Sequence, residues 1–416
     1  MEPLDQIRIL YLSRYLAGPL ATLILGVMGA EVIKVESCSN PDPIRLEAKG
    51  VYPDGEPGVR SWNRSGMGND RNRNKLGITL ELTTPKGKDL FLKLAKISDI
   101  VVENFQVGVM EKLGLTYEVL KEVNPDIIMI SLSSQGLTGP EKEYRSFGPT
   151  LEEIGGLQFI TGYPGEPPYI STLAYPDLIA GLEGVGLVIA ALRYRQETGR
   201  GLQIDFSQRE GTTCVIGETI MDYVMNGKVL TAMGNRHPYM APHGCYRCKG
   251  DDQWVTMAVS SEKQWRQLCE LMGKPELSED QRFSDILSRQ RNQRELDHLI
   301  EAWTKIHDRY EIQEILQKKG IAAGAVLNAE DLFANPHLKE KQFFDLIEHP
   351  EAGTHYYSGP PFRLSKTPGQ RGFPAPCLGQ HNTRIFGDLL NLFDKEIAEL
   401  EKAGIIGVEP TKDAHR

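Results

Sequence analysis

The stretch IRILYLSRYLAGPLATLILGVMGAEVIKVE, residues 7–36, decides the fold that we expect for this chain. Its first seven residues, IRILYLS, predict a strand, and a turn follows at LAGP. An apolar helix is predicted from about Leu20 to Met28, and EVIKVE predicts a second strand. A strand, a helix and a strand in this order form a parallel β-α-β unit, so we expect an α/β fold.

The same alternation continues along the chain. Residues 77–105 predict a strand, a helix opened by Thr84 or Pro85, and a strand that ends in Glu103, Asn104 and Phe105. A helix over 107–125 and a strand over 126–136 follow. Open α/β sheets bind ligands at the carboxyl ends of their strands, where these polar and aromatic groups are expected to lie. As ordinary loop residues they would need no function.

The segment YPDLIAGLEGVGLVIAAL, residues 175–192, predicts an N-capped helix that is apolar on nearly every side. An apolar run of about 15 residues is more typical of a core helix than of a membrane span. Gly181, Gly184 and Gly186 are unfavourable inside a helix, so we expect close backbone approach there. Asp177 is predicted at the helix N-terminus, where the helix dipole favours its ionised form. Capping is the simpler interpretation of these residues alone, and a carboxylate nucleophile is the alternative.

Composition and charge exclude several classes of protein. The 416 residues carry a formal net charge of −9, which argues against general nucleic-acid binding. No segment has 18 uninterrupted apolar residues, and the N-terminus does not read as a signal peptide, so no membrane association is expected. The six cysteines are few and scattered, which is typical of a reduced cytoplasmic protein. His243, Cys245 and Cys248 lack a partner motif, so we expect no metal site.

Several long segments resemble the class III coenzyme A transferases and their acyl-CoA racemase relatives. They are LSRYLAGPLATLILGVMGAEVIKVE (12–36), TPKGKDLFLKLAKISDIVVENFQVGVMEKLGL (84–115), SLSSQGLTGP (131–140), PDLIAGLEGVGLVIAALRYRQETGRGLQIDFSQRE (176–210), PPFRLSKTPGQ (360–370) and APCLGQHN (375–382). Together they cover nearly the whole chain, although none is a short diagnostic signature.

The resemblance implies a Rossmann-like large domain built from both chain ends, a small α+β domain and an interlocked dimer. The expected boundaries are 1–210 for the first part of the large domain, 211–229 for a linker, 230–330 for the small domain and 331–416 for the return to the large domain. A homodimer is expected, with a hetero-oligomer containing a paralogous subunit as the alternative.

The resemblance also implies a site. In this family the nucleophile is an aspartate before a glycine-containing apolar helix, and Asp177 occupies that position. The positions that match coenzyme A (CoA) contacts are Tyr15, Leu16, Ala17, Leu80, Asn104, Phe105, Lys112 and Arg145. Ser37 stands where the family has a basic phosphate contact, and Arg45 is a candidate substitute. A loop over 234–244, with His237 and His243, stands where relatives have a glycine-rich loop over the active site.

The implied activity is transfer of CoA from an acyl-CoA donor such as succinyl-CoA to another carboxylic acid. An aspartyl mixed anhydride and an aspartyl-CoA thioester would conserve the energy of the thioester. The CoA thioester is a substrate, and no tightly bound cofactor is expected. Leu16 replaces a glutamine of the formyl-transferring branch, which favours an acid that is larger and less polar than formate or oxalate, for example an aromatic or substituted dicarboxylic acid.

Three alternatives have different sequence signals. A racemase would need a Gly-His-Asp run where this chain has Ser146, Phe147, Gly148 and Pro149. A non-catalytic CoA-binding subunit of a hetero-oligomer would not need Asp177. A nicotinamide dehydrogenase fails because no G-x-G-x-x-G follows the first strand.

Overall fold

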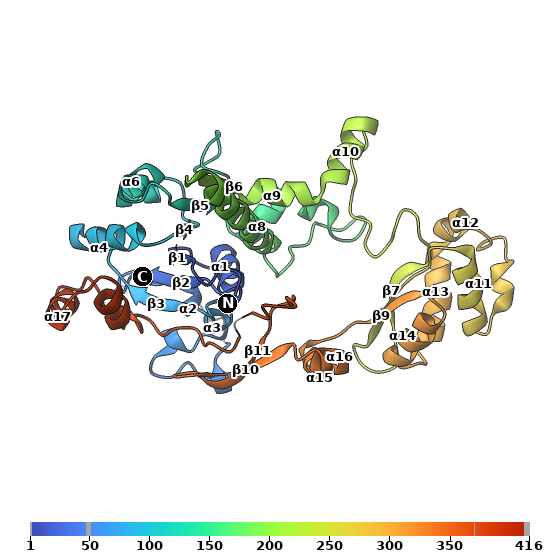
Figure 1. Ribbon diagram of the computed structural model, residues 1–416. Helices are drawn as coiled ribbons and strands as arrows, with labels where there is room; N and C mark the ends of the chain where they lie inside the picture. The colour runs from blue at the N-terminus through green and yellow to red at the C-terminus, as the bar shows by residue number, and fades with distance from the viewer. Residues whose placement is uncertain (1, 47–50, 370, 412–416) are drawn as a thin grey trace. The chain divides into compact units, whose positions relative to one another are not determined.

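The computed structural model describes residues 2–46, 51–369 and 371–411, and it divides into two compact units (Figure 1). Unit 1 contains Met1–Leu157, Ile170–Met225 and Glu340–Arg416, and unit 2 contains Gln158–Tyr169 and Asn226–Lys339. Both chain ends therefore belong to unit 1. The chain passes into unit 2 twice, first through a short segment that the sequence did not single out.

Unit 1 is organised by a parallel six-stranded sheet with the order β3-β2-β1-β4-β5-β6 (Figure 1). Its strands are β1 Arg8–Tyr11, β2 Glu31–Glu36, β3 Leu76–Thr79, β4 Ile100–Glu103, β5 Ile128–Ser133 and β6 Gln203–Ser207. The prediction of an α/β fold on a parallel sheet is confirmed. The strand order reverses between β1 and β4, and doubly wound sheets bind ligands in the crevice at such a reversal.

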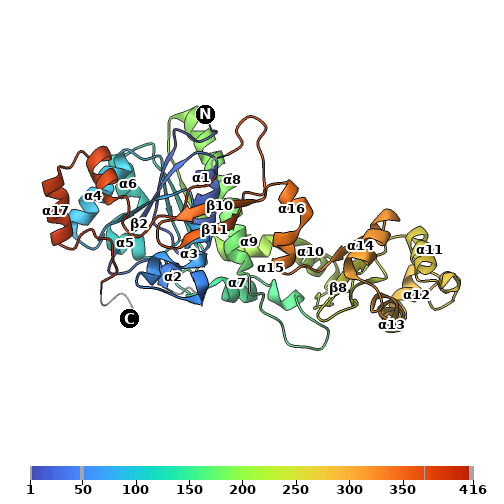
Figure 2. The same ribbon diagram turned by 90° about the horizontal axis from the view of Figure 1, so that it is seen from below.

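Helices cover both faces of this sheet. One face buries a core with side chains from α4, α5, α6, η5 and α17, and the other buries a core with side chains from α1 and α8. The helix α17, from the C-terminal end, lies beside α4 in both views (Figure 1, Figure 2). The helices of this unit up to residue 123 are α1 Ala17–Val27, α2 Pro43–Leu46, α3 Gly66–Arg71, α4 Pro85–Lys96, α5 Val109–Leu113 and α6 Tyr117–Val123. The later ones are α7 Gly148–Ile154, α8 Tyr175–Thr198, α9 Gln208–Val215, α10 Gly217–Asn226 and α17 Asp394–Lys402, with the π-helical turn η5 Arg384–Leu389 and the 3₁₀ turns η1 Pro53–Gly55 and η2 Ser61–Asn63.

Unit 2 has its own core beneath a three-stranded antiparallel sheet. Its strands are β7 His243–Arg247, β8 Trp254–Ala258 and β9 Ala322–Ala325. Its helices are η3 Gln158–Ile160, α11 Glu262–Leu271, η4 Pro275–Ser278, α12 Ile286–Arg291, α13 Gln293–Thr304, α14 Arg309–Lys318, α15 Ala329–Ala334 and α16 Pro336–Glu340, the last ending at the boundary with unit 1. Trp265 and Phe283 are fully buried in this core. The return to unit 1 continues into the hairpin β10 Phe344–His349 and β11 Gly353–Ser358.

Element boundaries differ from the prediction at two helices. The helix α1 begins at Ala17 instead of about Leu20, because Pro19 lies in the first turn, where its missing N–H has no helical partner to lose. The single helix predicted over 107–125 is broken into α5 and α6 at Gly114, which adopts a left-handed φ of 64°. The predicted start of α4 is confirmed, since the Thr84 side chain accepts a hydrogen bond from the Gly87 amide.

The helix α8 is the one helix in the described part of the chain that is long and apolar enough to cross a membrane. Core helices satisfy the same two criteria. Ala180, Val188 and Ala191 are buried in the core that α8 shares with α1. Gly181 meets the Ala17 carbonyl closely, as expected for a backbone approach, whereas a side chain at Gly186 would meet nothing within 4 Å. The expected close approach at Gly186 is therefore wrong within unit 1.

Candidate active site

The loop between β1 and α1 lies at the sheet reversal, and side chains hold it from both neighbouring strands. From the end of β4, Asn104 accepts the Arg14 amide at 2.8 Å and donates to the Arg14 carbonyl at 2.9 Å. From the loop after β2, Asp42 accepts the Tyr15 amide at 3.1 Å. Tyr15 has a left-handed φ of 61°, which is uncommon for a residue with a side chain. The loop therefore has one imposed conformation at the point where α1 begins.

The first turns of α1 and α8 meet beyond this loop. The backbone amide of Ala17, the first residue of α1, lies close enough to the Asp177 carboxylate to lower its pKa. Gly181 lies one turn further along α8. A Cβ added to it would lie 3.0 Å from the Ala17 carbonyl oxygen and 3.0 Å from the Leu20 side chain. An added Cβ on Gly148 would lie 2.5 Å from an Asp177 carboxylate oxygen. The Asp177 carboxylate thus has room because Gly148, its neighbour in space, has no side chain.

Asp177 does not cap its helix. The N-cap of α8 is Ala174, in a left-handed conformation and without a side-chain cap, and Asp177 is the third helical residue. The buried Glu152 instead accepts the Tyr175 amide at 3.2 Å and both donors of Ser171. The interpretation of Asp177 as a helix cap is therefore wrong, because another carboxylate takes the orphan amide at this helix end. Asp177 is left to face Ala17.

Burial raises the pKa of Asp177 to about 6, and the Ala17 amide opposes that shift. Within the described residues no charged side chain is a cause of the shift. The buried Glu36 at the end of β2 shows the opposite balance, because Arg45 and Lys34 lower its pKa to about 2 against the cost of burial. Asp177 is therefore a half-buried carboxylate that remains mostly ionised at neutral pH without a compensating cation.

Of the predicted site residues, the structure brings Ala17 to Asp177, and Tyr15 and Leu16 directly precede Ala17 in the chain. The Tyr15 ring packs edge-on against Phe147, with ring centroids 5.6 Å apart, directly before Gly148. These two rings give the site an apolar wall. Leu80 does not join them, because its side chain is 1% exposed inside the core of the opposite sheet face. Any contact of Leu80 with a ligand would have to be made by its main chain.

Asn104 and Phe105 have tasks within the protein. Both polar groups of the Asn104 amide are engaged by Arg14, so its side chain holds the loop. Phe105 packs on the core, and the Arg14 guanidinium lies 5.7 Å from its ring centroid. Arg14 also donates to Asn40 from an exposed position. The arrangement presents a cation above an aromatic ring at the edge of the crevice, a pair suited to a nucleotide.

The predicted basic contacts differ in availability. Lys112 and Arg145 are both exposed, and their side chains are free to reach a bound phosphate. Arg45 is 3% exposed and makes three hydrogen bonds to Glu36, so it is wrong as a substitute phosphate ligand. Ser37 donates to Glu81, which places a carboxylate where the family would have a cation.

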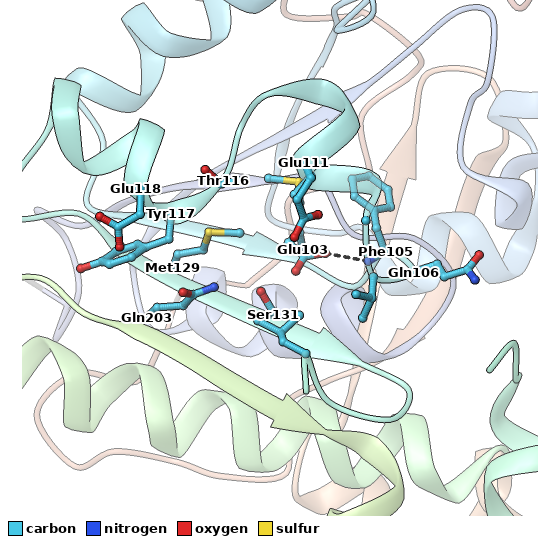
Figure 3. A pocket seen from close by; sticks show the side chains of 14 residues that line it. Glu103, Phe105, Gln106, Glu111, Thr116, Tyr117, Glu118, Met129, Ser131 and Gln203 are labelled. Carbon is cyan, nitrogen blue, oxygen red and sulfur yellow. Dashed lines mark hydrogen bonds between the residues drawn. The ribbon is translucent and has the colours of Figure 1, made fainter. Parts of the chain in front are cut away.

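A hollow of about 230 Å³ lies beside Phe105, between the ends of β4 and β5 and the helices α5 and α6 (Figure 3). Figure 3 shows Glu103 and Ser131 pointing into it from paired positions of the two strands. Burial raises the pKa of Glu103 to about 7, and its carboxylate accepts the Phe105 amide at 2.7 Å. Glu111 and Glu118 also line this hollow, so its charge disfavours the phosphates of CoA.

In unit 2, the loop over 234–244 is tied to its own strands. His243 bonds the Asn235 carbonyl at 2.7 Å, and the His237 and His243 rings lie 5.3 Å apart. A hollow of about 530 Å³ beside His243 and Cys245 opens on the sheet face of this unit. Cys248 is 4% exposed and packs in the core. In residues 2–46, 51–369 and 371–411 no group of three His, Cys, Asp or Glu side chains is placed to hold a metal ion.

Four residues of this site were missed in the sequence: Arg14, Asp42, Gly148 and Glu152. Gly148 had a signal, because it lies in the run that was compared with Gly-His-Asp. Asp42 and Glu152 had none, since nothing in a single sequence indicates which backbone amide a carboxylate will accept.

Comparison with known proteins places this geometry in a family. The family model described as CoA-transferase family III matches residues 4–382. A succinyl-CoA--D-citramalate CoA-transferase of Chloroflexus aurantiacus is 35% identical over 97% of this chain and 98% of its own length. The alpha subunit of a succinyl-CoA--L-malate CoA-transferase of the same organism is 32% identical over 97% of this chain and 92% of its own. A crystal structure of a CAIB/BAIF family protein from Brucella suis has a TM-score of 0.84 and 31% identity, covering 93% of this chain and 99% of that one.

Proposed function

The chain belongs to CoA-transferase family III, and we propose that it moves CoA from succinyl-CoA to a second carboxylic acid through covalent intermediates on Asp177. The observation that carries this proposal is the Asp177 carboxylate, which lies against the Ala17 amide and whose pKa no cation among the described residues lowers. With a pKa of about 6, it is mostly ionised at neutral pH and still basic enough to attack a thioester.

The proposed reaction proceeds in four balanced steps. Asp177 attacks the donor thioester carbonyl and releases CoA thiolate, which leaves a mixed anhydride on the aspartate. The thiolate then attacks the Asp177 carbonyl carbon, which forms the aspartyl-CoA thioester and releases the donor acid. The acceptor carboxylate attacks that thioester and gives a second anhydride. The thiolate finally attacks the acceptor carbonyl, so that the product leaves and the Asp177 carboxylate is restored.

The Ala17 amide has a defined task in this scheme. In the second and third steps the carbon under attack belongs to Asp177, and negative charge develops on the Asp177 oxygen. A backbone N–H already directed at that carboxylate can follow the developing oxyanion without reorganisation. The N-terminus of α1 adds the positive end of its dipole at the same place.

The substrates follow from the wall of the site and from the relatives. The paired rings of Tyr15 and Phe147 offer apolar surface next to Gly148 and Asp177, which favours an acceptor larger than formate or oxalate. The names of the two relatives specify citramalate and malate, which are substituted dicarboxylic acids. We therefore propose a substituted dicarboxylic acid as acceptor. Phe105 with Arg14, and the exposed Lys112 and Arg145, are the proposed contacts for the nucleotide end of CoA.

We further propose a cytoplasmic, interlocked dimer with the domain boundaries predicted from the sequence, except that Gln158–Tyr169 and residues 331–339 belong to unit 2. Along α8 the side chains of Leu182, Leu187 and Ile189 are exposed, and Gly186 faces open space, which supports a second chain packing on this helix. A paralogous partner is the alternative, because one relative is named as an alpha subunit. A CoA-binding, non-catalytic role and racemisation are the alternative functions, and the Asp177 geometry argues against the first.

Mass spectrometry after trapping tests the proposed function. Incubation with succinyl-CoA followed by hydroxylamine or borohydride should modify Asp177 in the wild-type protein and leave Asp177→Asn unmodified. The asparagine variant keeps the size of the side chain, so its fold and its CoA binding serve as controls. CoA binding without any adduct on Asp177 would overturn the proposal in favour of a non-catalytic subunit.

A further inference from the structure

We propose that Asp42 is a positioning residue that fixes the β1–α1 loop and thereby keeps the Ala17 amide directed at Asp177. The inference rests on the proposed role of Asp177. It assigns a task to a buried carboxylate that is separated from the nucleophile by 135 residues of sequence and that touches no substrate in this account.

Asp42 makes contacts on both sides of its carboxylate. One oxygen accepts the Tyr15 amide at 3.1 Å and the Ile44 amide at 3.2 Å. The other accepts the Lys34 ammonium group at 2.7 Å, and both side chains of this pair are 1% exposed. A buried carboxylate with a cation and two amides has one orientation in which all its partners are satisfied. The position of the Tyr15 amide is therefore fixed by a group that cannot turn away.

The loop needs such a group. A residue with a side chain in the left-handed region costs roughly 1–2 kcal/mol, and this conformation persists only where the surroundings impose it. Tyr15 occupies that region two residues before Ala17. Asn104 holds the adjacent Arg14 from the β4 side, and Asp42 holds Tyr15 from the β2 side. Without the Asp42 contact, the loop around the strained Tyr15 would be held only by the bonds between Asn104 and Arg14.

A second buried lysine extends the same support to α1. Lys75 donates to the Pro19 carbonyl in the first turn of α1 at 3.0 Å, and to the Arg71 carbonyl and Asn72 as well. Lys34 and Lys75 each lie 4.5 Å from the ring centroid of Tyr11, and Lys34 also donates to the Tyr11 hydroxyl. Tyr11 ends β1, so the strand, the loop and the helix start are held by one connected group.

The charges around this group support a positioning role. Glu36 accepts the Asp42 amide and is itself paired with Arg45 at 2.8 Å. A buried ion pair contributes little stability beyond that of a well-packed apolar pair of the same shape. What Lys34 and Asp42 add is therefore the fixed place of one backbone amide, and through it the place of Ala17.

The experiment compares Asp42→Asn with Asp99→Asn. Asp99 offers matched chemistry at the opposite end of β1, where it accepts the Arg8 amide at 2.7 Å and the Arg195 guanidinium at 2.7 Å. The readouts are the rate of Asp177 adduct formation with succinyl-CoA as a function of pH, and hydrogen exchange of the peptide over 12–20. Asp42→Glu is the second variant, because it keeps the buried charge opposite Lys34 and moves only the acceptor.

Asp42→Asn and Asp42→Glu should slow adduct formation at neutral pH by roughly tenfold or more, since a preorganised donor is loosened. They should also move the rise in rate to higher pH, because the Ala17 amide lowers the pKa of Asp177. Exchange over 12–20 should quicken. Asp99→Asn should alter none of these. Burial and the Ala17 amide are the only causes of the Asp177 shift among the described residues, so a variant that merely destabilises the fold would not move the pH profile.

Two outcomes separate this inference from the proposed function. An Asp177 that stays unmodified in the wild-type protein would overturn the proposed function, and the Asp42 inference with it. Wild-type adduct formation together with an unchanged rate, pH profile and hydrogen exchange in folded Asp42→Glu would overturn the Asp42 inference alone.

Discussion

At both ends of β1 in the six-stranded sheet, an aspartate accepts a backbone amide and pairs with a cation, but the two pairs differ in their exposure to water. At the amino end of β1, Asp99 accepts the Arg8 amide and pairs with Arg195, whose side chain is 19% exposed against 25% for Asp99. At the carboxyl end, Asp42 accepts the Tyr15 amide and pairs with Lys34, and both side chains are 1% exposed. One pair is within reach of water and the other is not.

The fully buried ion pair lies at the carboxyl end of β1, and the partly exposed pair lies at its amino end. An accessible ion pair can be replaced by water at little cost, whereas a buried pair has to be kept complete. The carboxyl end also holds Asp177, whose pKa is raised to about 6, and Glu36, whose pKa is lowered to about 2. The carboxylate of Glu36 is paired with Arg45, whereas no cation among the described residues lowers the pKa of Asp177, the proposed nucleophile.

The largest expected effect comes from Gly148→Ala, which would fill the space that the Asp177 carboxylate occupies beside Gly148. The new Cβ would lie 2.4 Å from the Ala174 Cβ and 2.5 Å from an Asp177 oxygen, so the carboxylate has to move. We expect adduct formation to slow by about 100-fold, because a displacement of this kind misaligns the nucleophile. Rapid-quench trapping with succinyl-CoA measures the rate.

Gly184→Ala is the matched control for that variant. It lies on the same helix as Asp177, and its Cβ would meet Leu132 at an ordinary 3.4 Å. We expect an unchanged adduct rate and a free energy of unfolding that is equal or higher by up to about 1 kcal/mol. Equal losses of rate in both alanine variants would contradict the special place of Gly148.

The next largest effect is expected on the free energy of unfolding, in the variant Asp177→Asn. Because the folded pKa of Asp177 is raised above its unfolded value, its contribution to stability is present below about pH 4 and lost as pH rises through about 6. Asp177→Asn removes that loss. At pH 8 the variant should be more stable than the wild-type protein by roughly 2–3 kcal/mol.

Urea unfolding of both proteins at pH 4 and at pH 8 measures this difference. The two curves should converge at the lower pH, where Asp177 is protonated. A variant that is less stable than the wild-type protein at pH 8 would mean that Asp177 has a stabilising partner.

The smallest effect is expected at the amino end. Asp99→Asn keeps an acceptor for the Arg8 amide and removes the charge opposite Arg195, so it should lower the free energy of unfolding by about 0.5–1 kcal/mol. Added salt should reduce the difference, because the pair is partly exposed. Denaturation at low and at high ionic strength measures this. If the free energy of unfolding fell by more than about 2 kcal/mol at both ionic strengths, the Asp99–Arg195 pair would behave like a buried pair, and the two ends of β1 would not differ.

The sequence was enough to predict the repeated α/β units, the Thr84 cap of α4 and the place of Asp177 near the start of an apolar helix, although Asp177 is the third residue of that helix and does not precede it. Those features depend on neighbours in the sequence. The roles of Asn104 and Asp42 depend on β4 and β2 lying on either side of β1, and no local pattern encodes which backbone amide such a side chain accepts. The expectation that Arg45 binds phosphate was wrong for a similar reason, because no local pattern shows that Arg45 pairs with Glu36 in the interior of the protein.

In the proposed mechanism Asp177 carries the acyl group and CoA in turn. The direct measurement is turnover of succinyl-CoA with succinate labelled with heavy oxygen in its carboxylates, followed by mass spectrometry of the peptide that contains Asp177. In the proposed scheme the acceptor leaves one of its oxygens on the aspartate in each cycle, so the wild-type peptide should gain heavy oxygen and the Asp177→Asn peptide should not. Label that enters succinyl-CoA while the Asp177 peptide stays unlabelled would contradict a covalent role for Asp177.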